Sequence, residues 1–263
     1  MMTYIAHNFQ VHEYPELDST NEEAARRADE LPDRSVIVAA KQSRGRGQGD
    51  NRWESEPGKN ITMTILFKPE RLPAGEQFSL SMAIALGTRD LVARHVNGCT
   101  IKWPNDIYVD DRKIAGILIE HVVMGNFIAR SLCGVGLNVN QSRFLSGAPN
   151  PVSLAGLTGR ELPTRAVMEE LLACIDKRYR EARDPRAQRR DYLAHLYRGR
   201  GVHAWEDANG PFRAAVQGVN AHGQLLLHDE RGATRAYNFK EVKPLPREEP
   251  RGRSSRRPGP PTT

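Results

Sequence analysis

The chain has 263 residues, of which 39% are hydrophobic and 27% are charged, a composition typical of a folded globular protein rather than a disordered one. No apolar run approaches the roughly 20 residues that a membrane-spanning helix needs, and the N-terminus lacks the basic and apolar segments of a signal peptide. The three cysteines, Cys99, Cys133 and Cys174, are widely spaced in apolar surroundings, which predicts reduced thiols in the cytoplasm rather than disulfides or a metal site.

The net charge of +6 is unevenly distributed. Residues 247–263 hold five arginines and two glutamates, so +3 of this charge lies in a Pro/Arg/Ser-rich tail. The tail has little to bury and is expected to be disordered. It is either a solvated extension or a contact for RNA or an acidic partner. The remainder is only mildly basic and does not by itself indicate nucleic-acid binding.

The first hundred residues contain clear helix and strand patterns. Ser19 and Glu22 fit a capping box at the start of the first helix. Two β-rich segments, 35–41 and 60–67, lie on either side of a glycine-rich loop. Helical patterns cover 17–33 and 75–96, and β-rich segments cover 35–41 and 60–67.

Short β-rich segments dominate residues 100–137, where "DIYVDDRKIAGI" predicts a hairpin that turns at 110–112. Residues 164–198 predict a long charged helical region interrupted at Pro185. From Gly199, short alternating strands separated by glycine turns predict a small SH3-like β-barrel. We therefore expect a mixed α and β domain over 1–198, the barrel over 199–246 and the tail over 247–263.

The segment "SRGRGQGDNRW", residues 43–53, alternates glycine with arginine and ends at a tryptophan. Glycine lets the backbone approach a ligand closely, and Arg46 suits forked contacts with a phosphate or carboxylate. Such a loop is expected to be disordered when empty and to order over an anionic ligand, with Trp53 stacking on a base. The alternative is a surface hairpin with a core tryptophan. Asp50 stands where a dinucleotide-binding fingerprint needs glycine, and no P-loop is present.

A second cluster lies in "KWPNDIYVDDRKIAGIL". Pro104 fixes a bend between two strands and presents Asn105 and Asp106 at its edge. Asparagine can pair with an adenine edge and aspartate can hold Mg²⁺, but Pro-Asn-Asp is also ordinary turn chemistry. Lys113 precedes a nearly apolar strand, so its ammonium lies either at the mouth of a dry pocket or in solvent.

A third segment is "CGVGLNVN", in which Gly134 and Gly136 either leave room for a flat ligand or mark a bulge. Together, "STNEEA", "QSRGRGQGDNRWESEPGKN", "KWPNDIYVDDRKIAGIL" and "GVGLNVN", followed by "FKEV", closely resemble the biotin–protein ligases. The resemblance covers roughly residues 15–242. Each motif is weak alone, but their order and length make the joint signal specific.

The resemblance implies an α+β fold with a class II synthetase-like mixed sheet, flanking helices and a small SH3-like barrel. It also implies an enzyme that activates biotin as biotinyl-5′-AMP with ATP and Mg²⁺, then transfers biotin to a lysine of a biotin carboxyl carrier protein domain. Lys113 and Arg46 match residues that stabilise charge during catalysis, and Asp106 matches a metal-linked acid. The matches to biotin contacts are Ser19, Thr20, Asn21, Gln42, Gly45, Arg46, Gly47, Lys113, Gly116, Gly134 and Gly136. The matches to ATP contacts are Arg46, Trp53, Asn105, Lys113 and Asn138.

The chain departs from the family pattern at the glycine loop. Gln48, Gly49 and Asp50 stand where many members carry further arginines, which leaves open how well the reactive intermediate is retained and whether the protein is a monomer or a homodimer. The first helix begins near residue 20, which leaves no room for an N-terminal helix-turn-helix. We therefore expect the monofunctional type, without specific DNA binding.

Three alternatives remain open. A lipoate–protein ligase shares the fold and chemistry, although the loop ending in "NRW" and the "KWPND" stretch favour biotin. A nucleic-acid-binding module would use the basic tail and the loop, but it leaves the segment 102–118 unexplained. A scaffold without activity is disfavoured because Lys113, Arg46 and Asp106 are all present.

Overall fold

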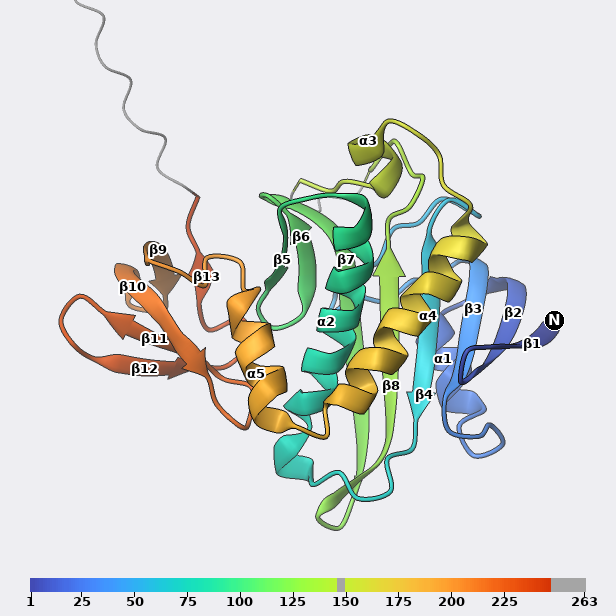
Figure 1. Ribbon diagram of the computed structural model, residues 1–263, viewed down its shortest axis with the longest axis horizontal. Coiled ribbons are helices and arrows are strands. Elements are labelled where there is room, and N and C mark those ends of the chain that lie inside the picture. The colour runs from blue at the N-terminus through green and yellow to red at the C-terminus, as the bar shows by residue number, and fades with distance from the viewer. Residues whose placement is uncertain (146–149, 247–263) are drawn as a thin grey trace, which may run out of the picture.

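The computed structural model describes residues 1–145 and 150–246. It contains a large eight-stranded sheet with helices on both faces and a smaller five-stranded sheet formed by later residues (Figure 1). The predicted mixed α+β fold is therefore confirmed. The predicted disordered tail at 247–263 lies outside the described residues.

The strands of the large sheet follow the order β1-β2-β3-β4-β8-β7-β6-β5. Neighbouring strands are antiparallel except for β2 and β3, which are parallel and are connected through a helix. The strands are β1 (Met2–Ala6), β2 (Phe9–Leu17), β3 (Ser35–Gln42), β4 (Ile61–Phe67), β5 (Cys99–Lys102), β6 (Asp106–Val109), β7 (Arg112–Met124) and β8 (Phe127–Leu137).

Two long helices, α2 (Phe78–His95) and α4 (Thr164–Glu181), cover one face of the large sheet and enclose the main core (Figure 1). They approach closely at Gly87, where a Cβ would lie 2.8 Å from the Ile175 Cα. α2 is buried along most of its length because it packs against the sheet, α4 and α5. The shorter elements on this side are the 3-10 helix η1 (Ala74–Glu76), α3 (Leu154–Thr158) and α5 (Pro185–Ala194).

The opposite face of the sheet carries α1 (Thr20–Arg26). Ala24, Ala28 and Leu31 form a second, smaller core with buried side chains of the sheet, among them Leu132 of β8. Because side chains alternate along a strand, the glycines at 134 and 136 lie on the same face as Leu132. This glycine-lined area beside α1 is where the candidate site lies.

The five-stranded sheet has the order β12-β11-β10-β9-β13 and is antiparallel throughout. It contacts the large sheet at Trp103, whose indole Nε1 donates to the Gly223 carbonyl at 2.9 Å. The second sheet therefore lies next to the turn that carries Asn105 and Asp106. Its strands are β9 (Val202–Asp207), β10 (Gly210–Val219), β11 (Leu225–Asp229), β12 (Thr234–Tyr237) and β13 (Lys243–Pro244).

Most of the predicted elements are confirmed, including the helix break, where Asp184 caps α5 by accepting from the Arg186 and Ala187 amides. The predicted capping box is wrong. Ser19 is the N-cap residue but makes no side-chain capping bond, and Glu22 pairs with Arg46 instead. The helix also ends at Arg26 rather than near residue 33, and β1 and β2 were not predicted. None of the helices in the described residues is long and apolar enough to cross a bilayer.

Candidate functional site

A cavity of about 600 Å³ opens between the glycine loop, the start of α1 and the glycine-lined face of the sheet. The predicted site residues converge on it from segments far apart in the sequence. Of these residues, the lining includes Ser19, Thr20, Asn21, Gln42, Arg46, Gly47, Trp53, Asn105, Asp106, Lys113, Gly116, Gly134, Gly136 and Asn138. Gly45 does not line the cavity, but a Cβ there would lie 3.2 Å from the Gln42 side-chain amide, so it packs directly behind the wall.

Neutral hydrogen-bonding groups form the end of the cavity next to α1. The Gln42 side-chain oxygen accepts from the Thr20 amide at 2.8 Å. The Thr64 hydroxyl donates to Asn21 Oδ1 at 2.5 Å and lies 2.9 Å from the Thr20 hydroxyl. Asn21 sits in a notch left by Gly134, where a Cβ would approach Asn21 Oδ1 to 2.3 Å. These hydrogen bonds hold neutral donors and acceptors in place at this end of the cavity, where they can meet the polar groups of a ligand.

The space above Gly116 and Gly136 holds the indole of Trp53. A Cβ on Gly136 would lie 2.3 Å from the Trp53 Cε2 atom, and one on Gly116 would lie 2.9 Å from Cζ3. The flat group directly above these two glycines is thus a side chain of the chain itself, while room for a ligand in the cavity that they line stays a prediction. Trp53 Nε1 and Asn138 Oδ1 are both buried without a hydrogen-bond partner among the described residues.

The glycine loop, residues 43–53, forms a short hairpin. The Gly47 amide donates to the Asn51 carbonyl at 2.8 Å, and the Trp53 amide donates to the Gly45 carbonyl at 3.1 Å. Gly49 has a φ of 64° near the tip, a conformation that favours glycine. The predicted loop is therefore a folded hairpin in the described structure, and its ordering on ligand binding stays a prediction.

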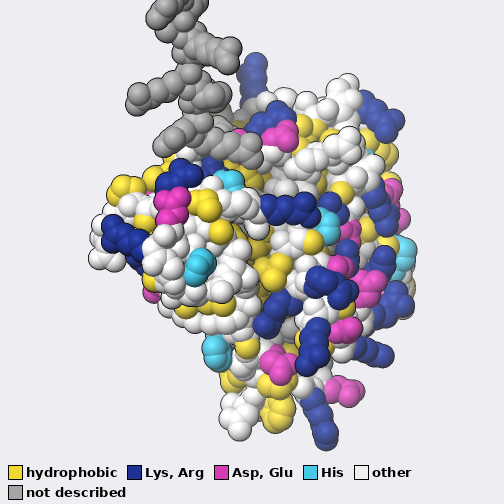
Figure 2. Space-filling model, turned by 60° about the vertical axis from the view of Figure 1, so that its left-hand side comes forward, with side chains coloured by type: hydrophobic (Ala, Val, Ile, Leu, Met, Phe, Trp, Pro, Cys, Tyr) yellow, Lys and Arg dark blue, Asp and Glu magenta, His cyan; other side chains and the backbone are white. Residues whose placement is uncertain are grey.

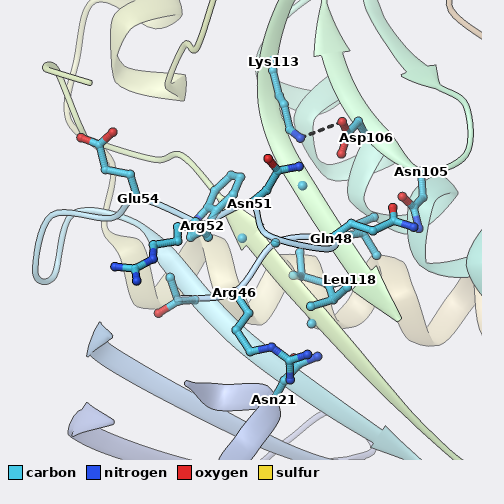
Figure 3. A pocket seen from close by; sticks show the side chains of 18 of the residues that line it. Asn21, Arg46, Gln48, Asn51, Arg52, Glu54, Asn105, Asp106, Lys113 and Leu118 are labelled. Atoms are coloured by element: carbon cyan, nitrogen blue, oxygen red, sulfur yellow. Dashed lines mark hydrogen bonds and ion pairs between the residues drawn. The ribbon is translucent and has the colours of Figure 1, made fainter. Parts of the chain in front are cut away.

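Two carboxylates hold the arginine of this loop. Arg46 Nη1 lies 2.5 Å from Glu22 of α1, and Arg46 Nη2 lies 2.9 Å from Glu120 of β7. Glu120 also accepts from the Asn21 side-chain amide at 2.8 Å. We call Glu22 and Glu120 the acidic clasp. In the close-up view, Arg46 points away from Lys113 toward Asn21 (Figure 3), so the two predicted cations share a cavity but face different carboxylates.

Breaking the acidic clasp is expected to loosen the loop without any ligand. Glu22→Gln combined with Glu120→Gln removes both charges but keeps an acceptor for Asn21. Because exposed ion pairs contribute about 0.2–1 kcal/mol each, amide hydrogen exchange over residues 45–53 should rise by a few-fold to about tenfold. Glu23→Gln is the control, since Glu23 pairs with Arg26. Equal exchange in the double variant and wild type would show that the clasp does not hold the loop.

The other end of the cavity carries a lysine–aspartate pair. Lys113 Nζ lies 2.7 Å from Asp106 Oδ2 (Figure 3), because β6 and β7 form a tight hairpin in which Tyr108 and Lys113 are paired. Asn105 donates from its amide to the Ser81 hydroxyl at 3.2 Å, which orients its side chain. Lys113 is therefore at the mouth of a partly enclosed pocket rather than fully solvated, with its charge balanced by Asp106.

The described residues contain no group of three histidine, cysteine or acidic side chains able to hold a metal ion. Asp106 is engaged by Lys113 through one oxygen. A single carboxylate fits Mg²⁺ only where phosphate oxygens and water supply the other ligands. Asp106 therefore remains a candidate for a cation that arrives with a nucleotide, not for a resident metal centre.

Several lining residues were not predicted from the sequence. Lys102 directly precedes Trp103, and its position next to the predicted Pro104 bend was the only sequence signal of a role in the site. Glu120 of β7 is not part of the lining but contacts Asn21 and Arg46 beside it, and strand alternation alone did not distinguish it. Further unpredicted residues at the cavity are Gln48, Asn51, Arg52, Leu118 and Phe239.

Comparison with known proteins gives consistent matches. A family model described as the biotin/lipoate A/B protein ligase family matches residues 14–138. The chain is 28% identical over 226 residues to the bifunctional ligase/repressor BirA of Bacillus spizizenii, covering 79% of this chain and 65% of that protein. It is 31% identical over 160 residues to the biotin--[acetyl-CoA-carboxylase] ligase of Paracoccus denitrificans, covering 59% of this chain and 66% of the relative. The chain thus spans less than two thirds of the length of the Bacillus relative.

Solved structures share the fold at lower identity. The biotin protein ligase of Aquifex aeolicus in complex with biotin and ATP superposes with a TM-score of 0.72 at 20% identity, covering 89% of this chain and 98% of that one. The biotin protein ligase of Leishmania major in complex with biotinyl-5-AMP gives a TM-score of 0.60 at 20% identity, covering 87% and 98%. At these identities the similarity establishes the architecture of the sheets and helices.

Proposed function

Because the chain belongs to the biotin/lipoate A/B protein ligase family, we propose that it activates biotin with ATP as biotinyl-5′-AMP and transfers biotin to a lysine of a biotin carboxyl carrier protein domain. The acceptor is thus a domain of a biotin-dependent carboxylase. One observation carries the proposal: a single cavity joins a neutral hydrogen-bonding end to an end with a lysine–aspartate pair. Biotin has the same division, with an uncharged bicyclic ring and a carboxylate.

We assign the neutral end to the biotin ring. Ser19, Thr20 and Gln42 supply donors and acceptors there, and all three line the cavity. The ring would lie beside Asn21, which the hydrogen bonds to Thr64 and Glu120 already fix in place. Preorganised polar groups of this kind bind a neutral ligand at little entropic cost. We assign Asn105, Trp53 and Asn138 to the nucleotide. All three line the same cavity, and Trp53 lies over the glycine-lined face of the sheet.

In the first half-reaction the carboxylate oxygen of biotin attacks the α-phosphorus of ATP, and the bond from that phosphorus to pyrophosphate breaks. Lys113 stabilises the negative charge on the phosphate oxygens, which is catalysis by position and electrostatics. Arg46 can stabilise the same charge only after its ion pairs break, because its guanidinium is paired with Glu22 and Glu120 in the described structure. An anionic ligand offers the arginine a replacement partner.

In the second half-reaction the neutral amine of the carrier lysine attacks the biotinyl carbonyl. The bond from that carbonyl to AMP breaks, and the amine proton passes to solvent. No side-chain nucleophile is required. The closed glycine loop would keep water from the anhydride. Mg²⁺, when bound with ATP, would neutralise phosphate charge, and Asp106 is the residue that would hold it.

We further propose that residues 1–198 form the catalytic domain and 199–246 a domain that positions ATP or the carrier. Two observations support this division: the second sheet has its own strand order, and Phe239 of that region lines the cavity. The cysteines Cys99, Cys133 and Cys174 are buried and free, which supports a reducing compartment such as the cytoplasm. Basic and acidic side chains are interspersed on the face drawn in Figure 2, so this face does not favour the nucleic-acid alternative.

The decisive test is incubation with ATP, labelled biotin and a carrier domain, with lipoate assayed in parallel. We expect biotin-dependent pyrophosphate release and a labelled carrier, with lipoate at least about 10⁴-fold less effective because the polar ring site would be left unpaired. Pyrophosphate release with lipoate but not with biotin would assign the alternative substrate. Release with neither would refute the proposed function.

A further inference from the structure

Lys102, the last residue of β5, lines the same cavity and has no role in the proposal above. Its side chain is half-buried. Its Nζ lies 3.2 Å from the Tyr108 hydroxyl and 5.0 Å from the centre of the Tyr108 ring. Lys102 and Asp106 are paired across the Trp103–Pro104 turn. Among the described residues, however, no carboxylate lies within ion-pair distance of the Lys102 ammonium.

The other cations of the cavity are in different situations. Lys113 is balanced by Asp106 at 2.7 Å, and Arg46 is balanced by two carboxylates of the clasp. Arg52 lines the cavity with an exposed side chain, so water solvates its charge. Within the described part of the chain, Lys102 is therefore the cavity cation that is half-buried and has a neutral partner.

Holding a charge in this half-buried position without an ion-pair partner is unfavourable. Burial lowers the pKa of Lys102, Asp106 opposes this effect, and the nearby Lys113 and Arg198 reinforce it. An anion that enters the cavity removes the cost, because it supplies the missing opposite charge. The free energy regained in this way would favour binding of a polyanion over a neutral ligand.

We propose that Lys102 binds the β- and γ-phosphates of ATP and stabilises pyrophosphate as it leaves. This inference rests on the proposed function. Lys102 is on β5 and Lys113 is on β7, and these two strands pair with opposite edges of β6. The two ammonium groups therefore reach the cavity from either side of β6. Because Lys113 is assigned to the α-phosphate, Lys102 is the adjacent cation that can pair with the departing pyrophosphate. As the phosphorus–oxygen bond breaks, its electron pair and negative charge pass to pyrophosphate, and Lys102 stabilises that charge without giving up a proton.

A structural role is the competing explanation, because the Lys102 ammonium also rests over the Tyr108 ring. Such a contact would contribute to stability and not to nucleotide affinity. The two roles differ in what a substitution changes. Loss of a phosphate contact weakens ATP and pyrophosphate binding selectively, whereas loss of a cation–π contact lowers the melting temperature and leaves both affinities unchanged.

The test compares Lys102→Met and Lys102→Arg in the full chain, with Lys59→Met as the control, since Lys59 pairs with Glu161 away from the cavity. Two quantities are measured: the affinity for inorganic pyrophosphate without biotin, by calorimetry, and the KM values for ATP and biotin in pyrophosphate release. We expect Lys102→Met to weaken pyrophosphate binding and to raise the KM for ATP by about tenfold or more. The KM for biotin should change less than about twofold, and Lys102→Arg should restore most of the loss.

The outcomes separate the two claims. Unchanged pyrophosphate affinity and ATP KM in Lys102→Met, or no pyrophosphate binding by the wild type, would overturn the inference. A wild type that binds pyrophosphate through Lys102 but never releases it from ATP in the presence of biotin would refute the proposed reaction instead, and would leave Lys102 as part of a polyphosphate site.

Discussion

Replacing Lys113 by alanine is expected to slow biotin-dependent pyrophosphate release by about 10²–10³-fold while leaving the protein folded. The Lys113 ammonium lies 2.7 Å from the carboxylate of Asp106, beside the turn that also carries Asn105. Removing one preorganised group that stabilises transition-state charge typically costs about 10²–10³-fold in rate. We therefore expect a loss of this size in the first half-reaction, measured by single-turnover formation of biotinyl-5′-AMP.

The design must separate chemistry from binding and from stability. Biotin affinity, measured by calorimetry without ATP, should change by only a few-fold, because the neutral end of the cavity is untouched. The variant leaves Asp106 without its partner, so the double variant Lys113→Ala and Asp106→Asn is needed to show that an unpaired carboxylate is not the cause. Near-normal adenylate formation in Lys113→Ala would remove this lysine from the reaction.

Structure that is local in the sequence could be predicted, and the hairpin that joins Asp106 to Lys113 is the clearest case. Asp106 and Lys113 are seven residues apart and belong to one hairpin, whose turn is marked by the Asp110–Arg112 stretch. Strand pairing in a short hairpin is largely set by its turn. The sequence was therefore enough to predict the hairpin that brings the two residues together, but not their ion pair, and it left open whether Lys113 lies at a pocket or in solvent.

The acidic clasp could not be predicted, for the opposite reason. Arg46 is 24 residues from Glu22 and 74 residues from Glu120, and each of the three residues reads as an ordinary surface charge. Only the tertiary arrangement of α1 and β7 brings the carboxylates to the loop. The same limit explains the failed capping box: Glu22 fits the local motif, but a distant arginine competes for its carboxylate.

The glycines of β8 show how a correct observation led to an incomplete interpretation. A strand with Gly134 and Gly136 does create room above the sheet, as predicted. The sequence cannot say which group fills it, and the structure gives the space to Asn21 and Trp53, which come from separate elements. Because each glycine has a defined neighbour in the structure, the effect of replacing it by alanine can be predicted separately for each position.

Gly136→Ala is expected to displace Trp53, and Gly134→Ala is expected to displace Asn21. The new Cβ would lie 2.3 Å from Trp53 Cε2 in the first case and 2.3 Å from Asn21 Oδ1 in the second. Neither contact is tolerable, so the neighbour must move. Overpacking of this kind costs about 1–3 kcal/mol, which corresponds to roughly a 5- to 150-fold change in an equilibrium. The two variants should therefore both lose activity, but through different substrates.

The distinguishing measurement is the pair of substrate affinities. Gly136→Ala should weaken ATP binding more than biotin binding and shift the tryptophan emission to longer wavelength as Trp53 becomes exposed. Gly134→Ala should weaken biotin binding more than ATP binding and leave the emission unchanged. Gly218→Ala is the control, because a Cβ there meets nothing within 4 Å. If both glycine variants impaired the two substrates equally, the division of the cavity into a ring end and a nucleotide end would be wrong, because each glycine supports only one of them.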